Sequence, residues 1–321
     1  MRRALRLAEK GRGFVLPNPM VGAVIVKNDE RIGEGFHHKH GDPHAEVMAI
    51  NSCEQSLEGA TIYVTLEPCD HVGKTSACTE AIIKSGIKKI IIASKDPSRN
   101  GAEVLKAAGL EVEIGLLGDQ AKQLNREFFT FHEKKRPFIT LKAALSLDGK
   151  IAKNRDSSTQ LTSQLAQKLT HVMRHQHHAI LVGAGTVIAD DPHLGVRLIE
   201  GRDPLRLVWK GERDLDPSLQ IFRDENHKIM EAKNLENLFK ELYEMGVVSV
   251  LVEGGSTVHS QFINEKAWDE MKVFYAPRLL GNEAVPFFEG ESQDSFKIKN
   301  VRQCGPDLLL TATPSWDLDP S

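Results

Sequence analysis

Three side chains that bind soft metal ions stand in two short stretches of this chain. His44 is followed two residues later by Glu46, Cys69 follows Pro68, and Cys78 comes after eight further residues. One imidazole and two thiolates suit zinc, and three protein ligands leave a fourth position open for water, as in catalytic zinc sites. The residue types and their spacing therefore predict a zinc site formed by His44, Cys69 and Cys78.

Glu46 is the carboxylate beside this site that is not needed as a ligand. Zinc lowers the pKa of bound water to about 7, and a neighbouring carboxylate can move the proton. The order His-x-Glu, Pro-Cys and a later Cys is typical of zinc nucleobase deaminases, although their two cysteines are closer together. We therefore predict that Glu46 is the catalytic acid and base of a deaminase-type site.

Two other interpretations of the Cys and His residues remain open. A closed, structural zinc site would need a fourth ligand, and only Cys53 and Cys304 remain as thiols. Cys53 lies in an expected helix, where a free Cys is more typical of a small buried side chain. His171 and His175 stand four residues apart on another expected helix, but no acidic or thiol partner lies near them in sequence, so a second metal site is not favoured.

The pattern of apolar residues predicts the elements that position the zinc ligands. A helix over Ala45–Asn51 would begin directly after His44. Pro68 suits the first position of a helix, which would place the Cys69 thiolate at a helix N-terminus and lower its pKa. The other expected elements of this half are helices over 1–10, 79–85, 102–108 and 121–132, and strands over 21–26, 32–35, 61–66, 89–93 and 112–115.

The second half of the chain continues this alternation, with strands expected over 138–144, 179–182, 205–209 and 247–252 and helices over 163–175 and 235–245. Two of the strands run into glycine-rich turns, Gly183-Ala184-Gly185-Thr186 and Glu253-Gly254-Gly255-Ser256-Thr257. Such a turn before a helix presents backbone N–H groups to an anion. The turns could bind a phosphate or pyrophosphate, or could be only tight connections.

Composition and length restrict the class of protein. A chain of 321 residues exceeds a typical single core, and the charged run 133–136 is expected to be a solvated linker, which suggests domains at 1–135 and 136–321. The net charge of −3 provides no general basic field for nucleic acid. Four cysteines make no disulfide framework, and no run resembles a signal peptide or a membrane span, so we expect a cytoplasmic protein.

Several motifs in fixed order resemble one family, the bifunctional deaminase–reductases of riboflavin biosynthesis, over nearly the full length. The motifs are Pro17-Asn18-Pro19, Pro43-His44-Ala45-Glu46, Val64-Thr65-Leu66-Glu67-Pro68-Cys69 with His71, Gly73, Lys74, Thr75 and Cys78, Ser146-Leu147-Asp148-Gly149-Lys150, Gly185-Thr186-Val187 with Ala189-Asp190-Asp191-Pro192, Val252-Glu253-Gly254-Gly255, and Ala276-Pro277. The resemblance implies an α/β chain with an N-terminal cytidine-deaminase-like α/β/α sandwich and a C-terminal dihydrofolate-reductase-like α/β domain.

The resemblance also implies two consecutive reactions. A diaminopyrimidinone that carries a phosphoribosylamino group is first deaminated at the zinc site, with Glu46 moving the protons. By the same resemblance, Asn18, His37, His71 and Lys74 contact this substrate. Lys74 and His71 lie between the two cysteines and suit its phosphate.

In the second reaction NADPH reduces the ribosyl group to ribityl. The matching positions for the substrate are Arg174, Leu194, Arg197 and Glu253, and two arginines suit a phosphate. The resemblance implies small-molecule partners and suggests a homo-oligomer. We expect neither nucleic acid nor a membrane as a partner. The matching positions for NADPH are Ala144, Ser158, Thr186, Asp190, Gly255, Ser256 and Thr257.

The chain departs from the family pattern at several positions. Ser76-Ala77 stands where the family has two prolines, Gln160 replaces a Trp, Trp209-Lys210-Gly211 replaces a hydrophobic-Asp-Ser sequence, and the stretch 215–234 is short. Because of these departures, the hypothesis of an active deaminase joined to a degenerate reductase also remains open. Two further hypotheses are a deaminase that edits nucleic acid and a non-enzymatic binding protein that zinc stabilises.

Overall fold

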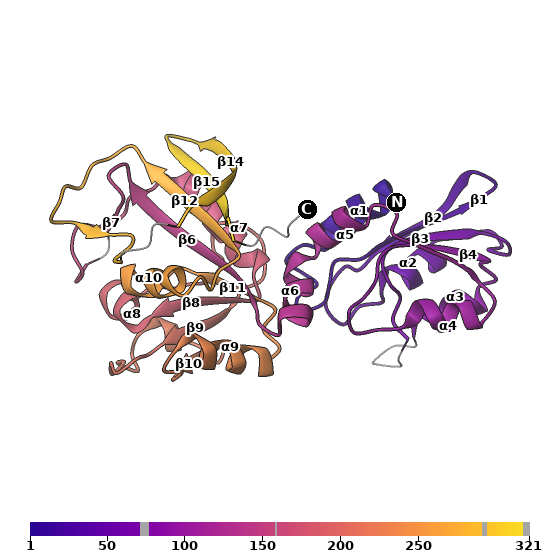
Figure 1. Cartoon of the computed structure of the whole chain (residues 1–321), viewed down its shortest axis with the longest axis horizontal. Helices are drawn as coiled ribbons and strands as arrows, with labels where there is room; N and C mark the ends of the chain where they lie inside the picture. The colour runs from indigo at the N-terminus through magenta and orange to yellow at the C-terminus, as the bar shows by residue number, and fades with distance from the viewer. Residues whose placement is uncertain (71–76, 158, 291–293, 317–321) are drawn as a thin grey trace. The chain divides into compact units, whose positions relative to one another are not determined.

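The computed structural model describes residues 1–70, 77–157, 159–290 and 294–316 (Figure 1). The contacts between residues divide the chain into two compact units, Met1–Lys135 and Arg136–Ser321. Within the described residues, no helix has both the length and the apolar composition needed to span a bilayer. Each unit has its own sheet and its own core.

The first unit is built on a five-stranded sheet in the order β2-β1-β3-β4-β5. The strands expected over 21–26 and 32–35 are present as β1 and β2, which pair antiparallel, and β3, β4 and β5 form the parallel half. Apolar side chains of the central strands, such as Ile25, Ile62 and Ile90, are fully buried. The strands are β1 (Gly22–Lys27), β2 (Glu30–Phe36), β3 (Thr61–Leu66), β4 (Lys89–Ser94) and β5 (Glu111–Ile114).

Helices cover both faces of this sheet, as Figure 1 shows. Helices α1 (Arg2–Ala8) and α5 (Gly118–Leu124) lie on one face, while α2 (Ala45–Asn51), α3 (Cys78–Lys84) and α4 (Gly101–Ala107) lie on the other. A 3₁₀ turn, η1 (Glu9–Gly11), follows α1, and α6 (Arg126–Lys134) ends the unit. The α/β/α sandwich is therefore confirmed.

The structure corrects two of the expected helices in this unit. The expected single helix over 121–132 is two helices, α5 and α6, which meet at Asn125. The helix is interrupted at Asn125, whose buried side chain is bound to the backbone of Met20. The Asn125 Oδ1 atom accepts the Met20 N–H at 2.8 Å, and its Nδ2 atom donates to the Met20 carbonyl at 2.9 Å. The helix expected to begin at Pro68 is also wrong, because residues 68–70 are not helical, and Cys78 begins the helix that follows among the described residues.

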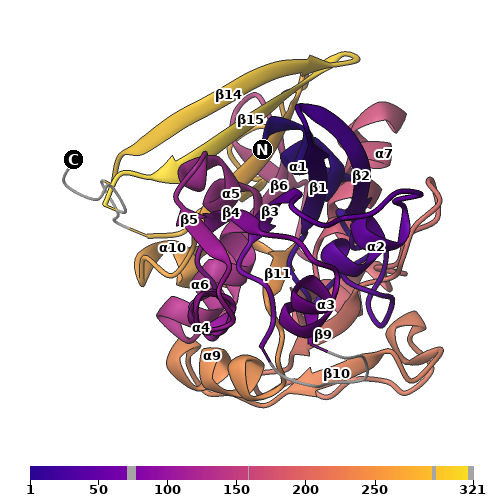
Figure 2. The ribbon, with the colours of Figure 1, turned by 90° about the vertical axis from the view of Figure 1, so that its right-hand side faces the viewer.

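The second unit is built on an eight-stranded sheet in the order β10-β9-β8-β11-β6-β12-β15-β14. The strands from β10 to β12 in this order are parallel, and β15 and β14 extend the sheet in antiparallel pairing. Figure 2 shows β14 and β15 as two long strands that lie side by side. The strands are β6 (Phe138–Ser146), β8 (Ala179–Gly183), β9 (Leu205–Trp209), β10 (His227–Met230), β11 (Ser249–Val252), β12 (Glu270–Ala276), β14 (Phe296–Cys304) and β15 (Asp307–Pro314), with β7 (Lys150–Ala152) and β13 (Val285–Pro286) in a small separate sheet.

Two hydrophobic layers enclose this sheet. Helices α9 (Leu235–Glu244) and α10 (Ser256–Asn264) pack on one face, where Leu238 and Phe262 meet Leu141. On the other face α7 (Gln164–Gln176) packs through Met173 against Leu251, and α8 (Ala184–Asp190) follows β8 with a 3₁₀ turn, η2 (Gln220–Phe222), beside it. The strands β10, β12, β14 and β15 of this sheet were not predicted from the sequence.

The charged run 133–136 is solvated only over residues 133–135, and it is not a free linker. Lys134 still belongs to α6, and the Arg136 guanidinium forms two 2.7 Å hydrogen bonds with the carboxylate of Asp269, which is almost fully buried. The same carboxylate accepts the N–H of Ile139 at the start of β6. The pair therefore fixes the beginning of the second sheet.

Candidate functional site

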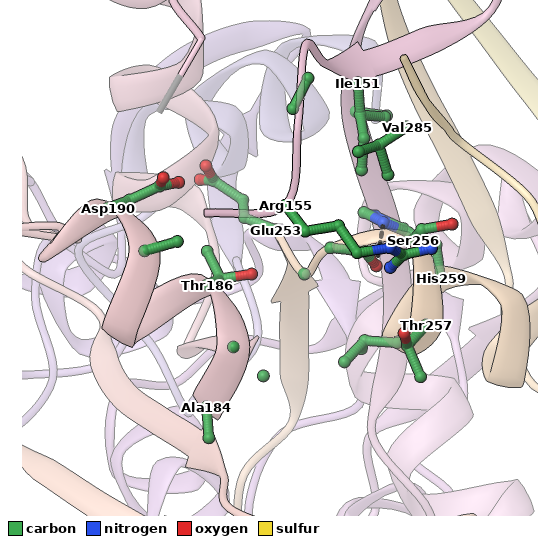
Figure 3. A pocket seen from close by; sticks show the side chains of 18 of the residues that line it. Ile151, Arg155, Ala184, Thr186, Asp190, Glu253, Ser256, Thr257, His259 and Val285 are labelled. Atoms are coloured by element: carbon green, nitrogen blue, oxygen red, sulfur yellow. Dashed lines mark hydrogen bonds between the residues drawn. The ribbon is translucent and has the colours of Figure 1, made fainter. Parts of the chain in front are cut away.

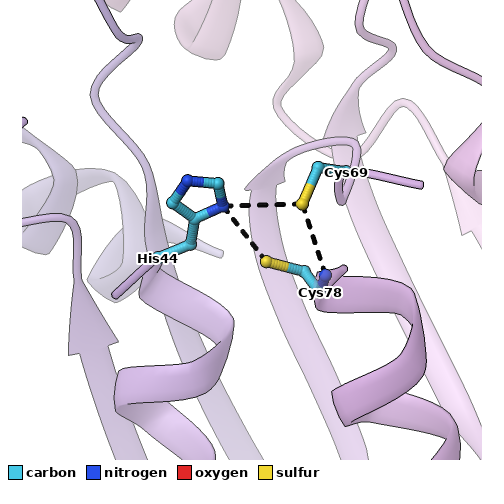
Figure 4. Close-up of side chains that lie close together, drawn as sticks. All are labelled: His44, Cys69 and Cys78. Carbon is cyan, nitrogen blue, oxygen red and sulfur yellow. Dashed lines mark hydrogen bonds between the residues drawn. The ribbon is translucent and has the colours of Figure 1, made fainter. Parts of the chain in front are cut away.

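The three predicted zinc ligands come together at the end of β3 and the starts of two helices. His44 directly precedes α2, Cys69 lies three residues after β3, and Cys78 is the first residue of α3. The His44 Nδ1 atom lies 3.2 Å from the Cys78 Sγ and 3.6 Å from the Cys69 Sγ (Figure 4). Among the described residues this is the one metal-binding group of three or more His, Cys, Asp or Glu, and Cys53 is not part of it.

Cys69 and Cys78 differ in their electrostatic surroundings. The backbone N–H of Cys78, at the start of α3, points at the Cys69 Sγ from 3.3 Å. A hydrogen bond with Cys78 lowers the pKa of Cys69 to about 4, and the same interaction raises the pKa of Cys78. The stabilisation of Cys69 that was expected from its own helix therefore comes mainly from the Cys78 side chain, with a further contribution from the Cys78 amide at the start of α3.

Glu46 lies in the first turn of α2, where it is only 3% exposed. Burial raises the pKa of Glu46 to about 7, although the nearby His44 favours the charged form. A carboxyl group with a pKa near neutrality can both accept and give a proton. One imidazole and two thiols within reach of one another fit zinc with an open fourth position, and the Glu46 carboxyl group is close enough to interact with His44 and Cys78.

The loop between β4 and α4 supports Cys69. The Glu67 carboxylate accepts the N–H groups of Asp96 and Ala102, and the Asp70 carboxylate accepts that of Asn100. Gly101 stands so close that a Cβ on it would lie 2.0 Å from the Pro68 carbonyl oxygen. The turn that carries Cys69 thus rests directly on the start of α4.

Replacing Gly101 by Ala is expected to move the Cys69 turn and lower zinc affinity by about 10–100-fold, as for changes in groups that support metal ligands. Competition with a chromophoric chelator measures this affinity. Gly118→Ala is the matched control, because Gly118 is likewise the first residue of its helix but faces the Ala93 carbonyl, at 2.9 Å from the new Cβ. Equal zinc affinity in the two variants would contradict the support assigned to Gly101.

Two of the residues implied for the deaminase substrate lie beside the zinc group. The His37 ring is 5.3 Å from the His44 ring between centroids, and the Asn18 side-chain amide lies 3.2 Å from His37 Nε2. Burial lowers the pKa of His37, which favours the neutral ring. His71 and Lys74, predicted for the same substrate, lie outside the described residues.

In the second unit, a cavity of about 550 Å³ opens at the carboxyl ends of β8, β9 and β11. Figure 3 shows Thr186, Asp190 and Glu253 around the turn that carries Ser256. Ser158 lies outside the described residues, and Gln160 does not line the cavity. The other positions predicted for NADPH all line it: Ala144, Thr186, Asp190, Gly255, Ser256 and Thr257.

The glycine turn before α10 fits the pyrophosphate of a dinucleotide. The Ser256 hydroxyl is buried and finds no hydrogen-bond partner among the described residues, so it can serve a ligand. A Cβ on Gly254 would lie 2.6 Å from the Val258 Cβ, and one on Gly255 3.3 Å from the Thr186 hydroxyl. A side chain would fill this space, which the two glycines leave open to a phosphate.

His259 fixes this turn to the neighbouring strand. Its Nδ1 lies 3.2 Å from the Gly255 carbonyl and its Nε2 3.2 Å from that of Lys142 in β6. Burial lowers the pKa of His259 to about 4, so the ring is neutral at pH 7 and its single N–H donates to one of these two carbonyls. The sequence did not indicate this residue, since an isolated His on a helix carries no motif.

A buried group of charges lies at one end of the cavity, centred on Glu253. The Arg174 guanidinium donates two hydrogen bonds to the Glu253 carboxylate, at 2.8 and 3.0 Å, and the Lys142 ammonium lies 3.3 Å from it. Burial alone would raise the pKa of Glu253, but these two cations hold it at about 2. Lys142 lines the cavity and was missed as a site residue, although it follows Leu141 in the sequence expected to open the second domain.

The remaining reductase residues predicted for the substrate do not line this cavity themselves. Arg174 reaches it through Glu253, Leu194 is buried in the segment after α8, and Arg197 lies exposed on the same segment. Lys210, one of the departures from the family pattern, is in the cavity lining with Trp209. The structure therefore brings Glu253 and Arg174 together, and leaves Leu194 and Arg197 on an adjoining loop.

Comparisons with known proteins agree with both sites. The model of the cytidine and deoxycytidylate deaminase zinc-binding region matches residues 1–94, and that of the RibD C-terminal domain matches residues 137–310. The riboflavin biosynthesis protein RibD of Aquifex aeolicus is 40% identical over 97% of this chain and 96% of its own length, and that of Escherichia coli is 35% identical over 97% of each.

Solved structures give the same result. RibD from Acinetobacter baumannii is 36% identical and superimposes with a TM-score of 0.94 over 98% of this chain and 97% of its own. A diaminohydroxyphosphoribosylaminopyrimidine deaminase/5-amino-6-(5-phosphoribosylamino)uracil reductase from Thermotoga maritima is 42% identical, with a TM-score of 0.87 over 98% of this chain and 97% of its own.

Proposed function

Because this chain belongs to the RibD family, we propose that its first unit, residues 1–135, carries the deaminase activity and its second unit, residues 136–321, the reductase activity. The protein is a bifunctional enzyme of riboflavin biosynthesis, with zinc and NADPH as its cofactors. The observation that carries the division is that the His44, Cys69 and Cys78 group lies in one unit and the dinucleotide-sized cavity in the other.

The substrates follow from the name of the Thermotoga maritima relative. The first is a diaminohydroxypyrimidine with a phosphoribosylamino group, which loses one amino group as ammonia. The second is the 5-amino-6-(5-phosphoribosylamino)uracil, whose ribosyl group is reduced to ribityl. These reactions need a metal site that activates water and a site that orients a hydride donor, and the two units supply one each.

In the deaminase unit, His44, Cys69 and Cys78 hold zinc, which when bound activates water for attack on the amine-bearing ring carbon. Glu46 takes the proton from that water and gives it to the departing amine, for which a pKa near 7 is suited. Asn18 and His37 orient the pyrimidine beside the zinc group. His71 and Lys74 receive the phosphate by family resemblance, and this assignment rests on the sequence alone.

In the reductase unit, the residues Ala144, Thr186, Asp190 and Gly255–Thr257 bind NADPH, which supplies the hydride, and Ser158 is added by family resemblance. Glu253 meets the substrate at the end of the cavity, where Lys142 and Arg174 keep it ionised. Arg174 also holds the loop that carries Leu194 and Arg197, through its bond to the Gly195 carbonyl. Arg197 reaches from that loop to the substrate phosphate.

The partners are small-molecule pyrimidines. The acidic balance of the chain favours neither nucleic acid nor a membrane surface as a further partner, and the family resemblance favours a homo-oligomer. Thiolate ligands require reduced cysteines, which favours the cytoplasm as the compartment.

A coupled assay tests this division of labour. The first substrate and the deaminated intermediate are added in separate reactions that contain NADPH. In each reaction the NADPH absorbance is expected to fall. After removal of zinc by a chelator, only the intermediate should still oxidise NADPH, and zinc should restore the response to the first substrate. If the intermediate oxidises no NADPH with zinc-replete protein, the second unit is a degenerate reductase.

A further inference from the structure

The segment between α8 and β9 is a loop that depends on side chains for its shape. Residues 191–204 contain neither helix nor strand, and Leu194 has a left-handed backbone conformation, with φ of 55°. Side-chain acceptors satisfy the backbone N–H groups: His193 accepts that of Gly195, and Asp203 that of Val196. A loop held in this way keeps its conformation only while its acceptors stay in place.

One face of α7 supplies further anchors of this loop. His171 Nδ1 accepts the N–H of Arg197 at 3.0 Å, and one turn further on His175 Nδ1 accepts the N–H of Arg202 at 2.9 Å. Between them, Arg174 donates to the Gly195 carbonyl at 3.1 Å and binds Glu253. Residues three and four apart share a helix face, so these side chains hold the loop along one line.

Both histidines are buried and act through a neutral ring. The ring nitrogen that accepts a backbone N–H carries no proton, which leaves the proton on Nε2. Burial, with the charges of Arg174 and Arg197 nearby, lowers the pKa of His171 to about 4. The pair with metal-like spacing in the sequence is therefore used to bind backbone amides.

We propose that His171 is a positioning residue of the reductase, which fixes the backbone of Arg197 and so directs the Arg197 guanidinium to the phosphate of the substrate. This inference rests on the role proposed above for Arg197. The guanidinium itself is exposed, and no anionic side chain pairs with it among the described residues, so it is available to a ligand. The N–H donors of a guanidinium bind a phosphate well only when the side chain is already oriented before the ligand arrives.

Two substitutions at His171 distinguish the loss of its hydrogen-bond acceptor from a change in the size of its side chain. His171→Asn places an amide oxygen near the position of Nδ1 and can still accept the Arg197 N–H, while His171→Leu cannot. For His171→Leu we expect KM for the phosphoribosylamino substrate to rise about tenfold with kcat changed less than about threefold, and for His171→Asn both constants to stay within about threefold of the parent. Deaminase activity of the same preparations is the internal control. If the Leu variant does not fold, His171→Gln, whose amide lies one methylene further out, replaces it.

A double-mutant cycle with Arg197→Met decides whether His171 acts through Arg197. We expect His171→Leu to raise KM by less than about twofold when Arg197 is already Met. Full, independent effects of the two substitutions, or an Asn variant as impaired as the Leu variant, would overturn the positioning role. If Arg197→Met alone leaves KM for the substrate unchanged, the role of Arg197 in the proposed function is wrong, and the inference about His171 is wrong with it.

Discussion

Replacing Glu46 by Gln is expected to lower the rate of deamination by roughly 10²–10⁴-fold while zinc remains bound. The carboxyl group is 3% exposed beside His44, Cys69 and Cys78, and its pKa of about 7 suits proton transfer in both directions. Gln has nearly the same shape but cannot take up or release a proton at neutral pH. The three zinc ligands are untouched, so the loss should lie in the chemical step.

The measurements for Glu46→Gln are ammonia release from the first substrate and zinc content of the purified protein. Glu80→Gln is the matched control, because Glu80 lies exposed on α3 in the same unit, where it pairs with Lys84 at 3.4 Å. NADPH oxidation with the deaminated intermediate should be unchanged in both variants. Deamination at the parental rate in Glu46→Gln would show that another group moves the protons.

Glu253→Gln is expected to remove most reductase activity, by about 100-fold or more, and to destabilise the second unit at pH 7 by about 3 kcal/mol. The substitution leaves the buried cations Arg174 and Lys142 without their common carboxylate, and Arg174 then loses the group that orients it. NADPH oxidation with the deaminated intermediate measures the activity. Deamination should continue at the parental rate, because the zinc group lies in the other unit.

The stability effect of Glu253→Gln should depend on pH in a defined direction. The pKa of Glu253 is lowered from 4.5 to about 2, so its ionised form stabilises the fold above pH 4.5, and this contribution disappears as the pH falls from 4.5 towards 2. The difference in free energy of unfolding between parent and variant should therefore shrink over that range.

Tryptophan fluorescence during urea unfolding isolates the second unit, since Trp209, Trp268 and Trp316 are the only tryptophans of the chain. Glu241→Gln is the control, because its pair with Lys228 is partly exposed and such pairs contribute little. A stability difference for Glu253→Gln that stays constant from pH 7 to pH 3 would contradict the ion-pair explanation.

Local sequence signals predicted much of the fold. The helix over Ala45–Asn51 and the strands over Thr61–Leu66 and Leu205–Trp209 have the expected bounds, because apolar periodicity and chain breakers act over a few residues. The prediction failed at Asn125, where the helix is interrupted by a side chain bound to Met20, more than a hundred residues earlier in the chain. A pattern read over a few neighbouring residues cannot reveal a contact between residues so far apart in the sequence.

Strand β14 was missed for a different reason. Strand β14 is exposed along almost its whole length, so it lacks the buried apolar face that makes a strand visible in a sequence. Its pairing with β15 is what holds it in the sheet. A strand of this kind is defined by its partner and not by its own composition.

The sequence by itself determined which groups can bind zinc and move protons, because ligand type, order and spacing around His44, Glu46, Cys69 and Cys78 restrict the chemistry before the chain folds. Only the tertiary structure decided how these groups are tuned. Cys69 receives an amide from the start of α3 in place of a helix of its own, and Glu253 is held ionised by Lys142 and Arg174, which come from β6 and α7. Burial and long-range contacts set these interactions, and both appear only when distant segments pack together.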